Sequence, residues 1–220
     1  MTPDAAPVAY PPAPWRTHGR AWFASYLVRA SEITVPAPLT IDARFGWTLG
    51  ALGVVEYLEG SPLVYREVVW MPARVSAKIG DRTVNGFFVS HMVVDSRASV
   101  AAGRELWALP KLFAKIDIDG TDERARVEVE VEDGARLTLE VRGHAPITRR
   151  SDRIATLQTR GADVIRFRGS TSAKVGLAEV RCTAGADAWA GLRSARRLPL
   201  AGAAMPAFET TMHEPETLRP

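Results

Sequence analysis

The strict alternation of apolar and charged residues around an Asp-Gly pair is the feature that most constrains the fold. The first segment alternates valine with glutamate (Val127, Glu128, Val129, Glu130, Val131, Glu132), and the second alternates apolar with polar residues (Arg136, Leu137, Thr138, Leu139, Glu140, Val141, Arg142). A period of two places the apolar residues on one face of a strand and the charged residues in water. Asp133-Gly134 between two such segments is a strong hairpin signal, and acids facing arginines across it add a modest surface stabilisation.

Most of the remaining sequence is strand-like. Residues 21–28, 63–71 and 83–94 are apolar runs, and the last two are rich in β-branched and aromatic residues. Helical signals are few: residues 96–103, with Asp95 or Ser96 as N-cap, and residues 187–193. Many short strands and few helices predict a mainly β protein, with an antiparallel or mixed sheet folded over into a closed barrel-like core and a few short helices.

The domain organisation follows from the proline content and the length. Residues 1–15 contain five prolines among 15 residues and predict an extended N-terminal arm. An arm of this kind can wrap a neighbouring subunit. The remaining 16–220 fits a single β domain, since 46% of the 220 residues are hydrophobic and supply a sizeable core.

Composition argues against several classes of partner. The net charge is only +3, and the densest basic run, 148–153, contains an acid and no aromatic residue, which favours a solvated loop over a nucleic-acid surface. No run approaches the roughly 18 apolar residues of a membrane span. No signal peptide is visible, and the lone Cys182, expected in the core, excludes an intramolecular disulfide framework. We therefore expect a cytoplasmic protein with no nucleic-acid or membrane partner.

Candidate chemistry centres on lysine and glutamate. The chain has only four lysines, and two of them, Lys111 and Lys115, lie in the largely apolar segment 106–115. Desolvation lowers the pKa of a lysine and frees a nucleophilic lone pair, whereas arginine stays protonated. Glu56 and Glu67 interrupt apolar strand-like runs. A buried carboxyl with a raised pKa suits a general acid, although each glutamate is equally compatible with the wet face of a half-buried strand. The four histidines show no metal-ligand spacing, so no metal site is predicted.

The lysine segment resembles a motif of the acetoacetate decarboxylase family, which reads Gly-Arg-Glu, a short spacer and Pro-Lys-Lys. The corresponding residues are Gly103-Arg104-Glu105 and Pro110-Lys111, and the resemblance extends over residues 20–212. It implies that Lys111 is the Schiff-base nucleophile. The second motif lysine is replaced by Leu112, which removes a neighbouring cation but preserves desolvation. On a straight strand Lys115 shares a face with Lys111, with the Cα atoms roughly 13 Å apart, which is too far for strong coupling.

The resemblance also implies further site residues. Glu56 and Glu67 match the order of the two family glutamates, with Glu59 as the substitute for Glu56 because the connection between them is short. Arg29 matches a substrate-orienting arginine, since a guanidinium can hold a carboxylate bidentately; the alternative is an ordinary strand-end arginine.

Residues near the lysine in sequence complete the expected site. Trp107 and Phe113 are expected to desolvate Lys111 and contact the substrate. Arg104 and Glu105 are expected to form an ion pair that braces the lysine loop. We expect this site in the barrel interior, since barrels of this size can enclose a small ligand. The resemblance implies a homo-oligomer.

The function implied is a Schiff-base lyase acting on a small β-keto or 2-oxo acid, most simply a decarboxylase of the acetoacetate type. No cofactor is expected, because the lysine imine itself supplies the electron sink. The alternatives are an aldolase-dehydratase on pyruvate-like substrates or another natural-product Schiff-base enzyme, and a non-catalytic ligand-binding barrel. An isomerase or cyclase that uses Glu67 as a base, without an imine, is a further reading.

Overall fold

The computed structural model describes residues 8–197 and 202–220, and this part of the chain contains fifteen strands, one α-helix and two short 3-10 helices. The strands are β1 (Trp15–Arg29), β2 (Thr40–Ile41), β3 (Trp47–Tyr57), β4 (Tyr65–Met71), β5 (Ala73–Ile79), β6 (Arg82–Phe88), β7 (His91–Val94), β8 (Lys111–Gly120), β9 (Arg124–Val131), β10 (Arg136–Gly143), β11 (Thr148–Arg160), β12 (Asp163–Ala184), β13 (Arg196–Arg197), β14 (Ala203–Met212) and β15 (Glu216–Leu218). The helix is α1 (Arg97–Trp107), and the 3-10 helices are η1 (Ala30–Glu32) and η2 (Ala186–Ala188).

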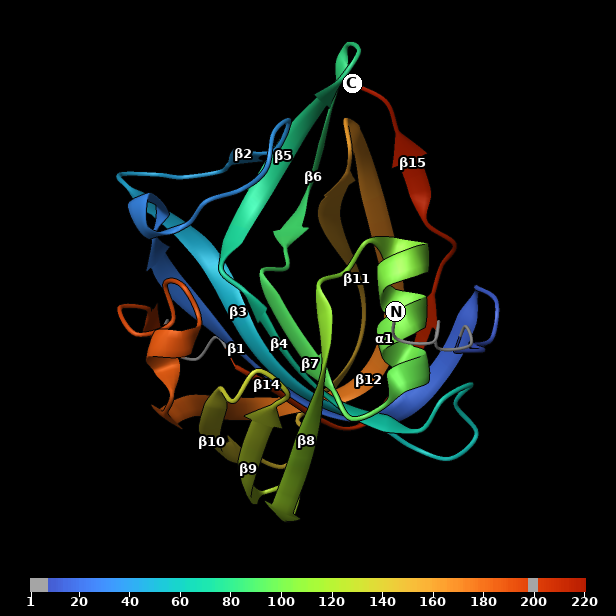
Figure 1. The fold of residues 1–220 in the computed structure, drawn as a ribbon. Helices are drawn as coiled ribbons and strands as arrows, with labels where there is room; N and C mark the ends of the chain where they lie inside the picture. The colour runs from blue at the N-terminus through green and yellow to red at the C-terminus, as the bar shows by residue number, and fades with distance from the viewer. Residues whose placement is uncertain (1–7, 198–201) are drawn as a thin grey trace, which may run out of the picture.

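The strands form one large mixed sheet that closes on itself (Figure 1). Its order is β10-β9-β8-β7-β4-β3-β1-β14-β12-β11-β6-β5-β2, and an additional pairing of β10 with β12 joins nine of these strands into a ring. Pairing is antiparallel except between β7 and β8 and between β6 and β11. The predicted mainly β architecture, a sheet folded over with few helices, is confirmed.

The predicted hairpin is formed by β9 and β10. Val129 pairs with Leu137 and Val127 with Leu139, and these side chains are buried. The chain turns at Gly134, whose φ of +89° is a conformation that glycine adopts without a steric cost. On the wet face, Arg136 Nη2 lies 2.7 Å from Glu130 Oε1, as the alternation predicts.

The two predicted helices have different outcomes. The first is confirmed as α1, with Ser96 as the N-cap: its hydroxyl accepts a hydrogen bond from the Ser99 amide. It continues one turn past Gly103, to Trp107, and ends where Ala108 adopts a left-handed φ of +53°. The predicted helix over residues 187–193 is wrong. Only the turn of η2 forms, and Gly191 at φ +75° directs the chain out of helical geometry.

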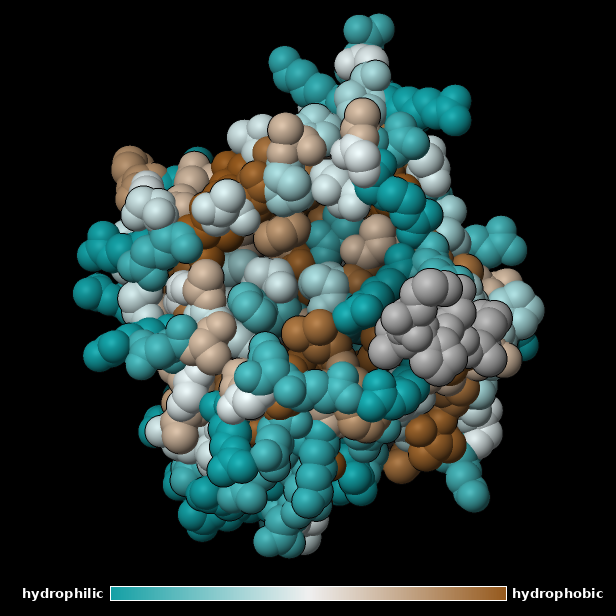
Figure 2. All heavy atoms as spheres, in the orientation of Figure 1, coloured by the Kyte–Doolittle hydropathy of each residue, from teal (hydrophilic) through white to brown (hydrophobic). Residues whose placement is uncertain are grey.

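Strands β1, β3 and β4 contribute side chains to two separate cores. Val54 and Val68 belong to the first core, which also contains the apolar face of the β9–β10 hairpin. Val55 and Val69, one residue further along each strand, belong to the second core. The first core therefore fills the closed ring, and the second lies on the other face of the same strands. The surface seen in Figure 2 is mostly hydrophilic, with limited hydrophobic patches.

The predicted N-terminal arm is described from Val8 onward, and its first seven residues lie outside the described part. Strand β1 begins at Trp15, within the predicted arm. The Trp15 indole donates to the Pro11 carbonyl oxygen at 2.9 Å, and the hydroxyl of Tyr10 donates to Glu105. Residues 10–15 therefore dock on the second core of their own chain.

Two smaller expectations concern Cys182 and membrane spans. Cys182 is half-buried and packs against the first core at its edge. Within residues 8–197 and 202–220, no helix is both long enough and apolar enough to span a membrane.

Candidate active site

Lys111 is the first residue of β8 and lies directly after the helix α1 and its short exit loop. Only 3% of its surface is exposed. The Arg104 side chain, on the last turn of α1, donates from Nε to the Lys111 carbonyl oxygen at 2.7 Å. Arg104 therefore braces the lysine loop through the backbone. The predicted Arg104–Glu105 ion pair does not form, since Glu105 accepts a hydrogen bond from Tyr10 instead.

Gly103 creates the path along which the lysine side chain runs. A β-carbon at this position of α1 would lie 2.4 Å from Lys111 Cδ and 2.8 Å from Cε. Any larger residue would push the lysine stem away from the helix. The glycine of the motif is thus a steric requirement of the buried amine.

The Lys111 amine has an acceptor for each of its three protons. Nζ lies 2.9 Å from Glu67 Oε2, 2.9 Å from Ser99 Oγ and 3.4 Å from the Tyr65 hydroxyl. An ammonium has three donors and no acceptor, so this arrangement suits the charged form. Glu67 and Ser99 are buried like the lysine, which makes the ion pair a buried one.

The electrostatic balance at Lys111 differs from the expectation drawn from burial alone. Burial is the largest single influence and by itself lowers the pKa of Lys111, because it favours the neutral amine. The Glu67 carboxylate and the contacts with Tyr65 act in the opposite direction and outweigh it. The pKa of Lys111 therefore lies above its ordinary value, and the prediction of a lowered pKa is wrong for the unliganded site.

Tyr57 and Tyr65 enclose the ion pair. The centroids of their rings lie 4.4 Å apart, and the Tyr57 hydroxyl is 3.5 Å from Glu67 Oε1. Burial raises the pKa of Tyr57 well above 10, with the Glu67 charge adding to it, and burial also raises the pKa of Tyr65. Both phenols stay protonated at neutral pH and serve as neutral hydrogen-bonding groups.

Ser99, Tyr57 and Tyr65 were not among the sequence candidates. Two of them share a face of their strand or helix with a motif residue or a sequence candidate. Tyr65 lies two residues before Glu67 and so shares its strand face, and Ser99 lies four residues before Gly103 on one face of the helix. Serine and tyrosine are common in such positions for structural reasons, so the spacing by itself does not single them out.

A cavity of about 130 Å³ lies in the second core, beside the ion pair. Glu67 and Trp107 are part of its wall, which is otherwise largely apolar. The full lining is Ala21, Phe23, Val55, Tyr57, Glu67, Val69, Met71, Val89, Met92, Trp107, Leu109, Ile154, Thr156, Phe167, Gly169, Thr171, Met205, Phe208, Thr210 and Met212. The cavity therefore lies on the outer face of β3 and β4, outside the closed ring, in contrast to the expected barrel interior.

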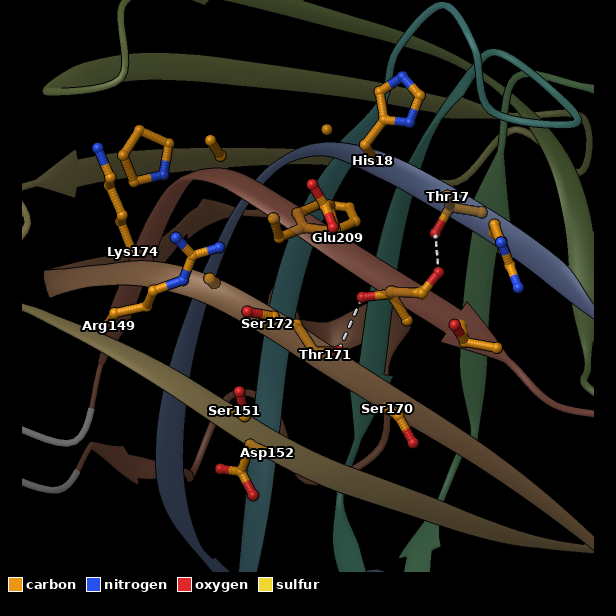
Figure 3. A pocket seen from close by; sticks show the side chains of 18 of the residues that line it. Thr17, His18, Arg149, Ser151, Asp152, Ser170, Thr171, Ser172, Lys174 and Glu209 are labelled. Atoms are coloured by element: carbon orange, nitrogen blue, oxygen red, sulfur yellow. Dashed lines mark hydrogen bonds between the residues drawn. The ribbon is translucent and has the colours of Figure 1, made fainter.

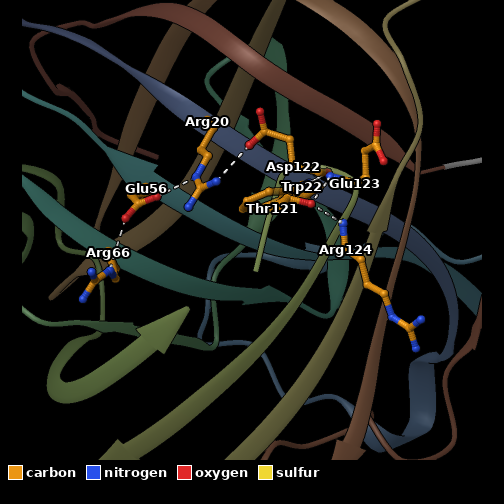
Figure 4. A network of polar contacts seen from close by, with 8 residues as sticks. All are labelled: Arg20, Trp22, Glu56, Arg66, Thr121, Asp122, Glu123 and Arg124. Carbon is orange, nitrogen blue, oxygen red and sulfur yellow. Dashed lines mark hydrogen bonds and ion pairs between the residues drawn. The ribbon is translucent and has the colours of Figure 1, made fainter. Parts of the chain in front are cut away.

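The structure does not bring Glu56 together with Lys111. Glu56 directly precedes Tyr57 on β3 and so faces the opposite side of the strand. Its carboxylate binds Arg20 Nε at 2.6 Å and Arg66 Nε at 3.3 Å, in a network that continues from Arg20 to Asp122 at 2.9 Å (Figure 4). The substitute, Glu59, is exposed, and its backbone oxygen contacts His18.

Two other predicted site residues lie away from the lysine. Arg29 is exposed at the end of β1, where its guanidinium lies 4.6 Å from the centre of the Trp47 ring. Phe113 is half-buried under the guanidinium of Arg97, at 4.4 Å, and is not part of the cavity wall. Trp107, by contrast, is 1% exposed and lines the cavity, as expected from its place beside the motif.

Neither Leu112 nor Lys115, which follow Lys111 on β8, places a second cation beside the Lys111 amine. Leu112 occurs where the motif has its second lysine; it is 39% exposed and faces the other side of the strand from Lys111. Lys115 is exposed and lies opposite Glu130 in the register of β8 and β9. The amine of Lys111 is therefore influenced by Glu67 and not by a neighbouring ammonium.

A wide groove adjoins the cavity on the outer side of β1, β11, β12 and β14 (Figure 3). It shares Phe208, Thr171 and Thr210 with the cavity wall. The hydroxyls of Thr171 and Thr210 lie 2.8 Å apart, and the Thr17 hydroxyl donates to the Thr210 carbonyl oxygen at 3.3 Å. These hydrogen-bonded threonines form the boundary between the groove and the cavity.

In the part of the chain that the structure describes, no group of three or more His, Cys, Asp or Glu residues is arranged to hold a metal.

Taken together, the fold and the site define a mainly β protein built around a buried, ion-paired lysine. The chain belongs to the acetoacetate decarboxylase family: the family model described as acetoacetate decarboxylase (ADC) matches residues 1–159. A curated relative, acetoacetate decarboxylase 3 of Mesorhizobium japonicum, is 32% identical over an alignment of 121 residues that covers 48% of this chain. The chain spans only 40% of the length of that relative.

Solved structures of the same fold agree with the family assignment. The crystal structure of acetoacetate decarboxylase from Legionella pneumophila matches with a TM-score of 0.63 at 14% identity, over 99% of this chain and 92% of that one. An acetoacetate decarboxylase-like enzyme from Sphingomonas wittichii matches with a TM-score of 0.62 at 15% identity, covering 100% and 98%. The enduracididine biosynthesis enzyme MppR complexed with pyruvate matches at 0.61 and 13% identity, covering 98% and 94%. At these identities the likeness concerns the fold.

Proposed function

We propose that this protein is a Schiff-base-forming lyase for a small oxo acid, most simply a β-keto acid decarboxylase. The observation that carries the proposal is the position of Lys111, whose buried amine lies 2.9 Å from Glu67, a residue in the wall of a largely apolar cavity. Family membership and the motif around Lys111 support the same chemistry. Glu67 and Lys111 are the proposed catalytic residues, and Trp107 contacts the substrate from the cavity wall.

The first step requires a neutral amine. Because Nζ and Glu67 Oε2 share a hydrogen bond, one proton passes from the ammonium to the carboxylate and leaves a lysine lone pair and a neutral carboxylic acid. The pair keeps its net charge of zero, so the transfer does not create an isolated charge in the buried site. The lone pair then attacks the substrate ketone, and the carboxyl returns the proton as the hydroxyl leaves as water.

The second step uses the protonated imine as an electron sink. In a β-keto acid, the electron pair of the bond to the carboxylate moves into the imine, which releases carbon dioxide and leaves an enamine. A proton delivered to the enamine carbon regenerates the imine, and water hydrolyses it to free lysine and product. Decarboxylation consumes one proton, and Glu67 is a carboxylate after the first step. We propose that Glu67 takes this proton from water and passes it to the enamine carbon, since it is the acid in the cavity wall that already contacts Nζ.

The cavity size supports a small substrate. Its volume of about 130 Å³ is small beside the roughly 300–1,000 Å³ that is usual for ligand pockets. A three- or four-carbon oxo acid suits this size better than a long acyl chain. The substrate we propose is therefore a small β-keto or 2-oxo acid, with no additional cofactor.

Borohydride trapping tests the proposal. The protein is incubated with acetoacetate or, separately, pyruvate, reduced with borohydride, and analysed as intact protein and as peptides. We expect a mass increase on the peptide that contains Lys111, and none in Lys111→Ala. Lys115→Ala is the matched control, because Lys115 is exposed on the same strand and its loss should leave the adduct intact.

The outcomes separate the alternatives. Release of carbon dioxide together with an adduct identifies a decarboxylase, whereas an adduct with pyruvate and no carbon dioxide identifies aldolase-dehydratase chemistry. Binding of an oxo acid without any adduct would contradict the imine and identify a ligand-binding protein. Turnover that tolerates Lys111→Arg and is lost in Glu67→Gln would identify an isomerase or cyclase without an imine.

The same proposal includes the assembly and the location. We propose a cytoplasmic homo-oligomer in which residues 1–15 form an N-terminal arm and residues 16–220 form one β domain. Light scattering after size-exclusion chromatography gives the mass of the particle. A mass of 24.0 kDa, that of one chain, would contradict the oligomer.

A further inference from the structure

The polar groups of the cavity wall are nearly all engaged with one another. Glu67 binds Lys111 and Tyr57, and the hydroxyls of Thr171 and Thr210 bind each other. Thr156 is different, because its hydroxyl oxygen is buried and has no hydrogen-bond partner in the described residues. A buried polar group without a partner is rare in folded proteins, and one in a cavity wall is a candidate for binding a ligand.

Thr156 occupies a fixed place in the wall. It lies in β11, is 5% exposed, and its neighbours on the same strand face are Ile154 and Gln158. The Gln158 amide is itself satisfied by the Val89 carbonyl oxygen at 2.8 Å. Rotation about the Cα–Cβ bond changes whether the hydroxyl or the methyl group of Thr156 faces the cavity, while the backbone stays in the sheet.

The cavity wall also lacks a cation. No arginine, lysine or histidine is among the described residues that line it, and the Lys111 amine contacts the Glu67 carboxylate of the wall. Arg29, which the family resemblance suggests for the substrate carboxylate, is exposed at the end of β1. A substrate carboxylate in this cavity therefore needs a neutral hydrogen-bond donor.

We propose that the Thr156 hydroxyl donates a hydrogen bond to the carboxylate of the substrate and takes the place of an arginine. The inference rests on the proposed function, because it assumes an oxo acid bound at Lys111. It specifies the substrate class as a short monocarboxylic oxo acid with an apolar remainder. A second carboxylate or a polyhydroxylated chain would find no partner in the apolar wall.

This arrangement has a consequence for the chemistry. An arginine would stabilise the carboxylate and thereby oppose its conversion into neutral carbon dioxide. A single hydroxyl in an apolar wall orients the carboxylate but solvates it weakly, so the charge is better accommodated once it has moved into the imine.

The test compares two ligands and two variants. Trapping on Lys111 by borohydride is measured against concentration for acetoacetate, which has a carboxylate, and for acetone, a neutral ketone. Thr156→Val removes the hydroxyl with little change of shape, and Thr156→Ser restores it. A hydrogen bond to a charged group corresponds to a roughly 10- to 150-fold change in affinity. We therefore expect the half-saturating acetoacetate concentration to rise at least about tenfold in Thr156→Val, with acetone unaffected and Thr156→Ser close to wild type.

Folding is followed in the same samples. Since Thr156→Val removes a buried hydroxyl without a partner, its melting temperature should equal or exceed that of the wild type. An equal effect of Thr156→Val on both ligands, or no effect on either, would overturn the role of Thr156 and leave the imine intact. Failure of the wild-type protein to form an adduct with either ligand would overturn the proposed function and this inference together.

Discussion

Replacing Glu67 with glutamine removes the counter-charge of the buried Lys111 amine. The two groups are 2.9 Å apart, with side chains only 4% and 7% exposed. At an effective dielectric constant of about 20, their Coulomb attraction is about 6 kcal/mol at this separation. Removing one partner of a buried ion pair costs about 3–5 kcal/mol, because the other partner remains desolvated. We expect Glu67→Gln to lower the free energy of unfolding at pH 7 by about 3–5 kcal/mol.

The pH dependence identifies the physical cause. In the wild type the pKa of Lys111 is raised above its ordinary 10.5, so the stabilisation is fully present below pH 10.5 and is lost as the pH rises through the folded-state pKa. In Glu67→Gln, unopposed burial lowers the pKa, and the folded protein holds a neutral amine where the unfolded chain holds an ammonium. The free energy of unfolding of the variant should therefore rise by about 1.4 kcal/mol per pH unit, relative to the wild type, between pH 7 and pH 10.

Urea denaturation at several pH values measures both effects. The double variant Glu67→Gln/Lys111→Met removes both charges and should recover most of the lost stability, since a buried ion pair can be replaced by apolar groups at little cost. Glu130→Gln is the matched control: its partner Arg136 is 74% exposed and Glu130 is 52% exposed, so its unfolding transition should stay where it is. If Glu67→Gln lowered the free energy of unfolding by less than about 1 kcal/mol, or by an amount that does not change with pH, the buried ammonium–carboxylate pair would be refuted.

Two further predictions concern the path of the lysine and the first core. Gly103→Ala puts a methyl group 2.4 Å from Lys111 Cδ, so trapping on Lys111 should slow about 100-fold, as for a displacement of about 1 Å; circular dichroism should show the β fold retained, and an unchanged trapping rate would contradict the steric role. Leu139→Ala empties a site that is fully buried in the hairpin and should cost about 2–5 kcal/mol. The comparison is Leu177→Ala, which is 39% exposed and should change stability by no more than about 0.5 kcal/mol; equal losses in urea denaturation would show that the hairpin does not bury its apolar face.

Predictions from local patterns succeeded where neighbouring residues alone decide the outcome. The hairpin follows from period-two alternation and a glycine turn, and the N-cap of α1 from a serine at the start of the helix. The second predicted helix failed because Gly191 adopts a positive φ. Gly191 is the local signal against a helix within residues 187–193, because glycine disfavours a helix interior by about 1 kcal/mol relative to alanine.

The site was predictable only in part. Lys111 and Trp107 were found through the motif, and Glu67 through an acid in an apolar run. Glu56 met the same criterion, yet it lies one residue before the cavity-lining Tyr57 and so points to the opposite face of β3. On that face it pairs with Arg20. In a strand that is buried on both faces, both phases are apolar, so the sequence does not reveal which face carries the site.

The mainly β architecture, the hairpin and the segment that carries the lysine can be read from local patterns, because each depends on residues close together in the chain. The groups that surround the amine are set by the folded chain. Ser99 comes from a helix, and Glu67 and Tyr65 from a strand more than 40 residues away in the chain. The direction of the Lys111 pKa shift also depends on these surrounding groups, because burial lowers this pKa and the Glu67 charge raises it. The balance between the two effects depends on distances that no local sequence pattern contains.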